Sequence, residues 1–102
     1  MTAAKTELFT DKQVELSKFA RSLSHPARIA IVSLLQEFDQ LTCNQIVERL
    51  PLAQATVSQH LKALREAGLV TGANCGTQVC YSLVPDQIRD FCREFRQMLG
   101  QS

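Results

Sequence analysis

A pair of short helices in the middle of the chain constrains the fold more than any other feature of the sequence. Thr42 followed by Gln45 forms the pattern that caps the start of a helix, and Pro51 stops that helix because its ring lacks an amide hydrogen. A second helix is predicted from about residue 54 to residue 67. Two helices with so short a connection predict a helix-turn-helix over residues 42–67.

The second of these helices has two chemically different faces. Val57, Leu61 and Leu64 are spaced by four and three residues, so they share one face that we expect to be buried. The other face carries amides, hydroxyls and cations. These candidate DNA-binding residues are Gln54, Thr56, Ser58, Gln59, Lys62 and Arg65. Amides and hydroxyls suit base edges in the major groove, and Lys and Arg suit phosphates, so the face predicts DNA reading. The alternative is an ordinary helical hairpin with a solvated polar face.

Length and charge set limits on the class of protein. The 102 residues predict a single domain, 1–102, and the net charge of +1 is too small to indicate a nucleic-acid partner by itself. We expect no membrane association, because no apolar run is long enough to span a bilayer and the N-terminus lacks the core of a signal peptide. A cytoplasmic protein is therefore predicted, with its four cysteines reduced by default.

Two helices are predicted before the helix-turn-helix, after a flexible arm at residues 1–9. The first begins at Thr10 or Asp11 and ends near Leu23. Ser24 is the predicted cap of the next helix, which runs to about Phe38 with a proline in its first turn. Apolar residues cover more than half of this second helix, so we expect it to be the central core helix.

A β-hairpin and a final helix are predicted after the helix-turn-helix. Two β-prone runs, 69–71 and 78–83, flank a tip at 72–77 that contains Asn and Gly, which predicts a wing over residues 69–84. A last helix follows over residues 85–99. The sequence therefore predicts a mainly α winged helix-turn-helix, with about five helices plus two strands.

The first and last predicted helices carry more large apolar residues than a small core needs. The candidates for a dimer interface are Leu16, Phe19, Phe91, Phe95 and Met98. The alternative is that these side chains pack within one chain. DNA sites with two-fold symmetry are read by dimers, so the DNA-reading hypothesis also favours a homodimer.

Two segments carry a resemblance to a known family. In their order along the chain, LSHPARIAIVSLL and QATVSQHLKALREAGLV resemble the ArsR/SmtB family of bacterial winged-helix repressors, and the resemblance extends from about residue 12 to 99. It implies a homodimer that binds operator DNA near its own promoter and lets go when an inducer binds. Inducers in the family include metal ions, arsenic or antimony species, and oxidised or persulfide sulfur.

The sequence departs from the metal-binding members of that family. Many of them have two cysteines in the run ELCVCDL, whereas the matching run here, QLTCNQI, has only Cys43. Others bind metal between their terminal helices through Asp and His, but the matching run here has Asp86 and no His. His25 and His60 are expected to serve structure or DNA contact. No metal site or cofactor is therefore assigned, although a metal or metalloid stays open because the usual ligand sets are only partly present. The wing run GANCGTQVC lacks the arginines common in family wings.

Among the four thiols, Cys75 and Cys80 are the candidate sensor pair. We expect Cys75 at the turn and Cys80 in a strand, several ångströms from disulfide geometry, with a flexible wing able to close the gap. Such a pair suits a redox or metalloid sensor, and the alternative is two unrelated thiols. Cys43 and Cys92 are less favoured as sensors, because they are expected to be a helix-start thiol and an interface or core filler.

The sequence also bears on two other functional classes. A winged-helix module that binds protein instead of DNA is supported by the near-neutral charge and the Arg-free wing. A thiol enzyme is disfavoured, because the chain has no C-x-x-C motif and no Gly-rich cofactor loop. The sequence therefore predicts a regulator that is not an enzyme.

Overall fold

The computed structural model describes residues 8–101 as five helices and three short strands. In chain order these are α2 (Asp11–Ser22), α3 (Pro26–Phe38), β1 (Leu41–Thr42), α4 (Cys43–Val47), α5 (Gln54–Glu66), β2 (Val70–Cys75), β3 (Gln78–Leu83) and α6 (Pro85–Met98). Most of the predicted flexible arm, residues 1–7, lies outside the described residues. A mainly α fold with a β-hairpin wing is confirmed.

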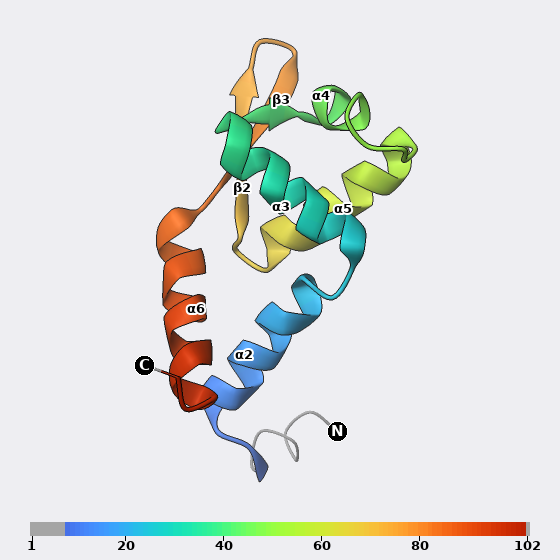
Figure 1. Cartoon of the computed structure of the whole chain (residues 1–102). Helices are drawn as coiled ribbons and strands as arrows, with labels where there is room; N and C mark the ends of the chain where they lie inside the picture. The colour runs from blue at the N-terminus through green and yellow to red at the C-terminus, as the bar shows by residue number, and fades with distance from the viewer. Residues whose placement is uncertain (1–7, 102) are drawn as a thin grey trace.

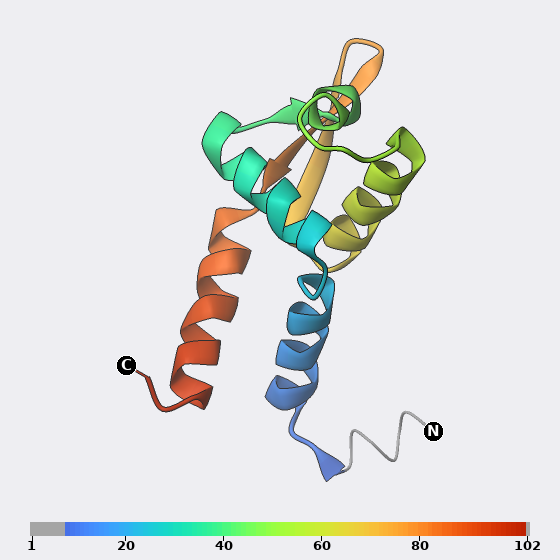
Figure 2. The same cartoon turned by 45° about the vertical axis from the view of Figure 1, so that its right-hand side comes forward.

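The elements gather into two parts. Helices α3, α4 and α5 pack with the sheet at one end, and the β2–β3 hairpin projects from that end (Figure 1). Helices α2 and α6 extend side by side at the other end, and a view turned by 45° shows the same arrangement (Figure 2). None of the helices over residues 8–101 is long and apolar enough to cross a membrane.

One apolar core holds the two parts together. Its buried members are Phe19, Ile31, Leu35, Leu41, Ile46, Val57, Leu61, Leu64, Leu69 and Val70. They come from α2, α3, α4, α5 and two strands, so most elements contribute to the same core. The expectation that α3 is central holds for Ile31 and Leu35, whereas Ile29 and Phe38 on the same helix are exposed.

Phe19 joins α2 to α6. Its ring stacks on Phe91, with centroids 4.5 Å apart, and lies 5.5 Å from the ring of Phe95. An ion pair of 3.5 Å between Lys12 and Glu94 adds a contact nearer the end of the two helices. The C-terminal helix is thus held to the domain mainly by aromatic packing against α2.

The first two helices begin at capping residues. Thr10 and Gln13 form a reciprocal capping box at the start of α2, as the sequence predicts for Thr10. The prediction that Ser24 caps α3 is wrong, because the Ser24 hydroxyl donates back to the carbonyl of Arg21. His25 takes the capping position instead, and its Nδ1 accepts from the amide of Ala27 at 3.4 Å.

The helix-turn-helix has a shorter first helix than predicted. Thr42 and Gln45 form the expected capping box. Helix α4 ends at Val47, whereas the sequence predicts that it continues to Leu50, the residue before Pro51. A tighter turn follows, in which the amide of Arg49 donates to the carbonyl of Ile46. Pro51 therefore lies in the connection between α4 and α5, and α4 ends before it.

The sheet contains a third strand that the sequence analysis missed. Its order is β1-β3-β2, with both pairs antiparallel, and Leu41 and Thr42 lie opposite Tyr81 and Cys80. A strand of two residues is too short to show a period-two pattern. This strand matters for the arrangement of the fold, because it joins the start of α4 directly to the hairpin.

The hairpin is longer, and its tip shorter, than predicted. Cys75 pairs with Gln78, so only Gly76 and Thr77 form the turn, in place of the predicted tip at 72–77. Gly76 has a φ of +69°, which suits the tight two-residue turns that join twisted strands. Pairing continues from this turn to Val70 opposite Leu83, which gives the wing a single register.

Replacing Phe19 by alanine should destabilise the protein strongly. The ring is only 6% exposed and holds α2 against α6, so we expect a loss of about 3–5 kcal/mol in the free energy of unfolding. The matched control is Phe38→Ala, because Phe38 is 41% exposed and its ring centre lies 4.6 Å from the guanidinium carbon of Arg49. That change should cost less than about 1 kcal/mol in urea denaturation. Similar losses in the two variants would contradict this assignment of the core.

Candidate nucleic-acid interface

Helix α5 presents the predicted polar face to solvent. Gln54, Ser58, Gln59, Lys62 and Arg65 are exposed, and Thr56 is half-buried. On the opposite side, Val57, Leu61 and Leu64 are completely buried, as their spacing predicts. The packing of one face therefore fixes which side chains point outward. Their contact with DNA itself stays a prediction.

The cations of this face are not neutralised by ion pairs. The ion pairs formed within residues 8–101 are Lys12–Glu94, Arg89–Asp86 and Arg93–Asp90, all on α2 and α6. Lys62 and Arg65 take part in none of them. Both side chains can therefore meet phosphates without first breaking a pair.

Arg65 also connects the helix to the wing. Its guanidinium carbon lies 6.0 Å from the centre of the Tyr81 ring on β3. A Cβ atom at Gly72 would lie 3.5 Å from that guanidinium carbon and 2.9 Å from a methyl of Val79, so glycine leaves the space that this packing needs. Neither Gly72 nor Tyr81 was predicted from the sequence to contribute to this junction, although a glycine inside a strand is itself a signal of close approach.

Two hollows on the surface lie along this junction of helix and wing. One is lined by Ser58, Lys62, Arg65, Glu66 and Tyr81. The other is lined by Cys43, Asn44, Gln54, Gln78, Val79 and Tyr81, from α4, the start of α5 and β3. The polar face of α5 and the wing thus form one continuous surface, to which Asn44, Gln78 and Tyr81 were not assigned from sequence.

A polar cluster holds α5 on its buried side. His60 is buried, and its Nδ1 accepts a hydrogen bond of 3.1 Å from Nε of Arg28. The same guanidinium donates to the carbonyl of Ser22 at 3.3 Å, and the His25 ring lies 4.5 Å from that of His60. Of the two roles expected for His60, a structural role or a contact with DNA, its burial and its bond to Arg28 support the structural one.

His60 is held in its neutral form. Burial lowers the pKa of its imidazole, and the neighbouring charges of His25 and Arg28 lower it further. A neutral ring is also what the hydrogen bond requires, because only an unprotonated Nδ1 can accept from Arg28.

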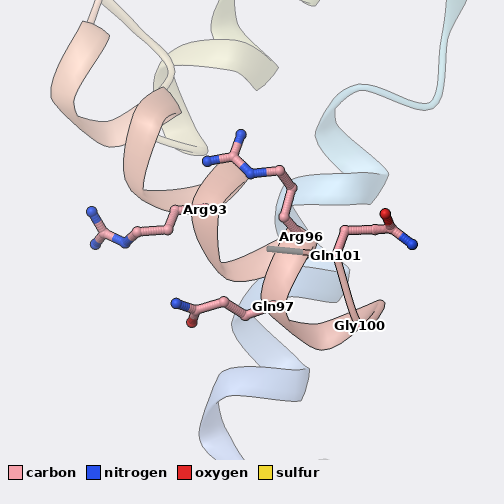
Figure 3. Close-up of a pocket in the computed structure, with 5 residues that line it drawn as sticks. All are labelled: Arg93, Arg96, Gln97, Gly100 and Gln101. Carbon is pink, nitrogen blue, oxygen red and sulfur yellow. The ribbon is translucent and has the colours of Figure 1, made fainter.

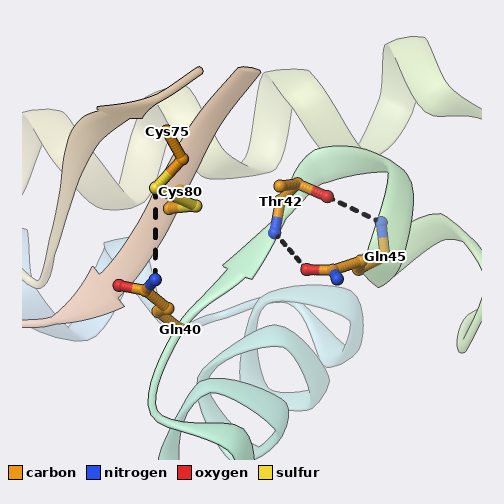
Figure 4. Close-up of a disulfide and its surroundings, with 5 residues drawn as sticks. All are labelled: Gln40, Thr42, Gln45, Cys75 and Cys80. Carbon is orange, nitrogen blue, oxygen red and sulfur yellow. Dashed lines mark hydrogen bonds between the residues drawn. A yellow bond between two sulfur atoms is a disulfide. The ribbon is translucent and has the colours of Figure 1, made fainter. Parts of the chain in front are cut away.

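The wing contains a disulfide between Cys75 and Cys80 (Figure 4). Their Cα atoms are 5.9 Å apart, inside the usual range for a disulfide, so the expectation of several ångströms' misfit is wrong. The reason is the short tip: Cys75 belongs to β2 and not to the turn, which places it diagonally across from Cys80. The Gln40 amide donates to Cys75 Sγ at 4.0 Å (Figure 4).

A separate hollow lies on α6, far along the chain from α5. Arg93, Arg96, Gln97, Gly100 and Gln101 line it (Figure 3). Arg93 is already paired with Asp90 at 3.3 Å. This hollow lies at the α2–α6 end of the molecule, so it is not part of the face that α5 and the wing form.

Comparison with known proteins places these features in a family. The sequence profile described as "Bacterial regulatory protein, arsR family" matches residues 25–71, which include α3 and the helix-turn-helix. The transcriptional repressor PagR of Bacillus anthracis is 32% identical over 82 residues, which cover 74% of this chain and 82% of PagR. The chain belongs to the arsR family of bacterial regulatory proteins. This confirms the ArsR/SmtB resemblance and the prediction that the chain is not an enzyme.

Other similar proteins differ in their sequence identity to this chain and in the share of each chain that is matched. The transcriptional repressor SmtB of Mycobacterium tuberculosis is 48% identical over 63 residues, which cover 62% of this chain but only 46% of SmtB, so the match spans about half of that relative. A solved structure titled as a possible transcriptional regulator for arsenical resistance is 31% identical with a TM-score of 0.69, and covers 76% of this chain and 80% of its own. An ArsR-like regulator from Rhodococcus sp. RHA1 shares the fold, with a TM-score of 0.76 at 24% identity, and covers 86% of this chain and 81% of its own.

The metal ligands that occur in some arsR-family members are only partly present here. Over residues 8–101, no three His, Cys, Asp or Glu side chains come together as a metal would require. Asp86 binds Arg89 at 3.0 Å. Burial raises the pKa of the Cys43 thiol, which lies against the carbonyl of Gln54, and Cys92 is exposed on α6.

Stability should depend on the protonation of His60. Its folded-state pKa lies below the ordinary value of 6.5, so the unfolded chain binds the proton first as the pH falls. The free energy of unfolding should be highest above pH 6.5, fall from there down to the lowered pKa, and then level off. Urea denaturation between about pH 7.5 and about pH 5 measures this fall.

An asparagine provides the matched comparison. Its amide oxygen can accept from Arg28 as Nδ1 does, but it does not titrate. His60→Asn should therefore remove most of the fall, while His25→Asn should retain it, because burial of His60 is the main cause. An unchanged pH profile in His60→Asn would assign the effect to another group.

Proposed function

We propose that this chain is a homodimeric, sequence-specific DNA-binding repressor that an inducer releases from its operator. The observation that carries the proposal is the outward face of α5, which combines amides and hydroxyls with two cations that form no ion pair within residues 8–101. Its thirteen residues make a rod about 20 Å long, which suits insertion into the major groove of DNA. As a regulator that acts on bacterial DNA, the protein would work in the cytoplasm.

The roles within this face follow from the chemistry of the side chains. Gln54, Thr56, Ser58 and Gln59 occupy the first turns of α5, where base edges are read in helix-turn-helix proteins. Lys62 and Arg65 lie further along and suit phosphates. Arg65 also packs on the wing, so it would set the angle between helix and wing as it binds.

The homodimer is supported by apolar side chains at one end of the molecule. Leu16 and Phe19 are buried within the chain, and Phe91 and Phe95 are half-buried against Phe19. Met98 is 46% exposed. Leu8, Phe9 and Leu99 are also exposed, on the same α2–α6 end. A second copy covering this end would bury Met98 and its exposed neighbours and leave α5 free.

Two routes of induction are proposed, and the contacts favour one. Metalloid binding would need thiols that converge, and such a group of three ligands is absent from residues 8–101. Thiol oxidation needs only a pair, and Cys75 and Cys80 are already joined. Cys43 and Cys92 are less suited, because each is a free thiol in the described structure.

The alternative is a winged-helix module that binds protein. The Arg-free wing and the net charge of +1 support it. It predicts no salt-dependent binding to any DNA, whereas a DNA-binding protein loses affinity steeply as salt rises.

Gln59 and Lys62 should separate specificity from affinity. Gln59→Ala should lower the preference for operator over random duplex by about 1–3 kcal/mol, because one base contact is lost. Lys62→Ala should weaken binding to both duplexes alike and reduce the slope of log affinity against log salt by about 1. Lys18→Ala, on the exposed side of α2, is the control and should change neither quantity. Equal losses on both duplexes for both variants would refute this division of roles.

Met98 should control assembly. Met98→Asp places a charge among the exposed apolar residues, so the dimer should dissociate in sedimentation velocity and operator affinity should fall. The stability of the monomer should change little, because the side chain is nearly half exposed. Gln97→Asp adds the same charge at the next, exposed position and should leave the dimer intact. A dimer that persists in Met98→Asp would place the interface elsewhere.

A further inference from the structure

The two wing cysteines lie where a disulfide can form without moving the strands. Cys75 pairs with Gln78 and Cys80 with Ala73, so the cysteines are diagonal neighbours on the same face of the hairpin. Side chains alternate between faces along each strand, and Gly76 and Thr77 set the register. The turn therefore brings the two sulfur atoms together.

The two sulfurs differ in their access to solvent. Cys75 is exposed, near the outer end of the wing, while Cys80 is 8% exposed in the central strand. An oxidant in solution would therefore meet Cys75 first. Cys80 is shielded from that oxidant yet adjacent to the product, which is the arrangement of a reactive cysteine and its resolving partner.

The cysteines lie on the face of the hairpin opposite to that of Gly72 and Tyr81. Gly72 and Tyr81 pair with one another, and Arg65 of α5 lies over the Tyr81 ring and beside the place that a Cβ of residue 72 would take. The cysteines occupy the alternate positions, on the face where Gln40 lies (Figure 4). A reaction at the pair therefore changes the wing without covering the residues that would read DNA.

The pair is also connected to the helix-turn-helix. Cys80 lies opposite Thr42, whose side chain accepts from the amide of Gln45 and begins α4 (Figure 4). The covalent link thus runs from the outer end of the wing to the strand beside the cap of α4. A change at the tip has a short, hydrogen-bonded route to the first helix of the motif.

We propose that Cys75 and Cys80 form a reversible, peroxide-reactive site, and that closing their disulfide weakens operator binding. The proposal rests on the function proposed above and names its regulation. It also fits the compartment, because disulfides in cytosolic proteins are usually transient and redox-sensing.

The reaction is balanced with hydrogen peroxide as the oxidant. The Cys75 thiolate attacks one peroxide oxygen, the O–O bond breaks, and the products are a sulfenic acid on Cys75 and hydroxide. The Cys80 thiol then attacks the Cys75 sulfur, the S–O bond breaks, and water leaves with the thiol proton. Two thiols and one peroxide give one disulfide and two waters. A cellular dithiol reverses the step by thiol–disulfide exchange.

The sign of the effect follows from the flexibility that the bond removes. The bond links strands that are already paired, so it leaves their register unchanged and restricts bending of the tip toward DNA bound to α5. With the bond open, the segment from Cys75 to Gln78 keeps only its hairpin pairing and can bend toward the DNA backbone. An Arg-free wing has no strong phosphate contact to compensate for lost fit.

The test compares reduced and peroxide-treated full-length protein on an operator selected from a random duplex pool. Fluorescence anisotropy should show that peroxide weakens binding by at least about fivefold, the lower end of ordinary coupling between two sites. Intact mass should fall by two hydrogen atoms per chain, and a dithiol should restore both values.

Variants assign the response to the wing. Cys75→Ser changes an exposed side chain, so it should fold, bind like the reduced protein and ignore peroxide. The matched control, Cys92→Ser, removes an exposed thiol on α6, far from the wing, and should respond like the unmodified chain. A response that persists in Cys75→Ser, or one absent from the control, would overturn the assignment.

The two proposals fail in different ways. Equal or tighter binding after complete disulfide formation would overturn the switch and leave DNA binding intact. If the reduced protein recovers no duplex from the pool with salt-dependent affinity, the DNA-binding proposal itself fails.

Discussion

The position of α5 depends on three side chains on its buried face. Val57, Leu61 and Leu64 are completely enclosed by the core, and burying each contributes about 1.5–3 kcal/mol. These residues fix the rotation of the helix about its axis as well as its place. Because the rotation of α5 about its axis is fixed, the side chains of Gln59 and Lys62 face solvent. The chemistry of the outward face is thus a consequence of packing on the inward one.

One polar residue interrupts that packing, and its surroundings explain how it is tolerated. His60 is buried on α5, where an unpaired ring nitrogen would be costly. Arg28 satisfies it from α3 and also reaches the carbonyl of Ser22 at the end of α2. The hydrogen bonds therefore join three helices at one point. Apolar packing holds α5 against the core, and this cluster fixes it relative to the first two helices.

Local signals in the sequence were sufficient to predict most helices and strands. They were insufficient where an element forms only through contact with residues far away in the chain. The capping box of Thr42 and Gln45 was readable because both partners lie within one turn. The strand at Leu41 was not, because its only evidence is pairing with Tyr81, forty residues away along the chain. At the wing, the outcome depended on register: a two-residue tip places Cys75 in β2 and within reach of Cys80. The hydrogen bond between Arg28 and His60 could not be predicted either, because its two partners also lie far apart in the chain.

The near-neutral charge of the chain is compatible with a DNA surface because several carboxylates are paired with cations away from α5. Asp86, Asp90 and Glu94 all lie on α6, where Arg89, Arg93 and Lys12 neutralise them. Within residues 8–101, Lys62 and Arg65 of α5 form no ion pair, so they supply a positive field that Glu66, in the same hollow, offsets only in part. The wing adds no arginine to this field, so its contribution to binding must come from its shape. A wing that acts through shape is controlled by whatever fixes its conformation, and a covalent bond across one face does so without altering the field.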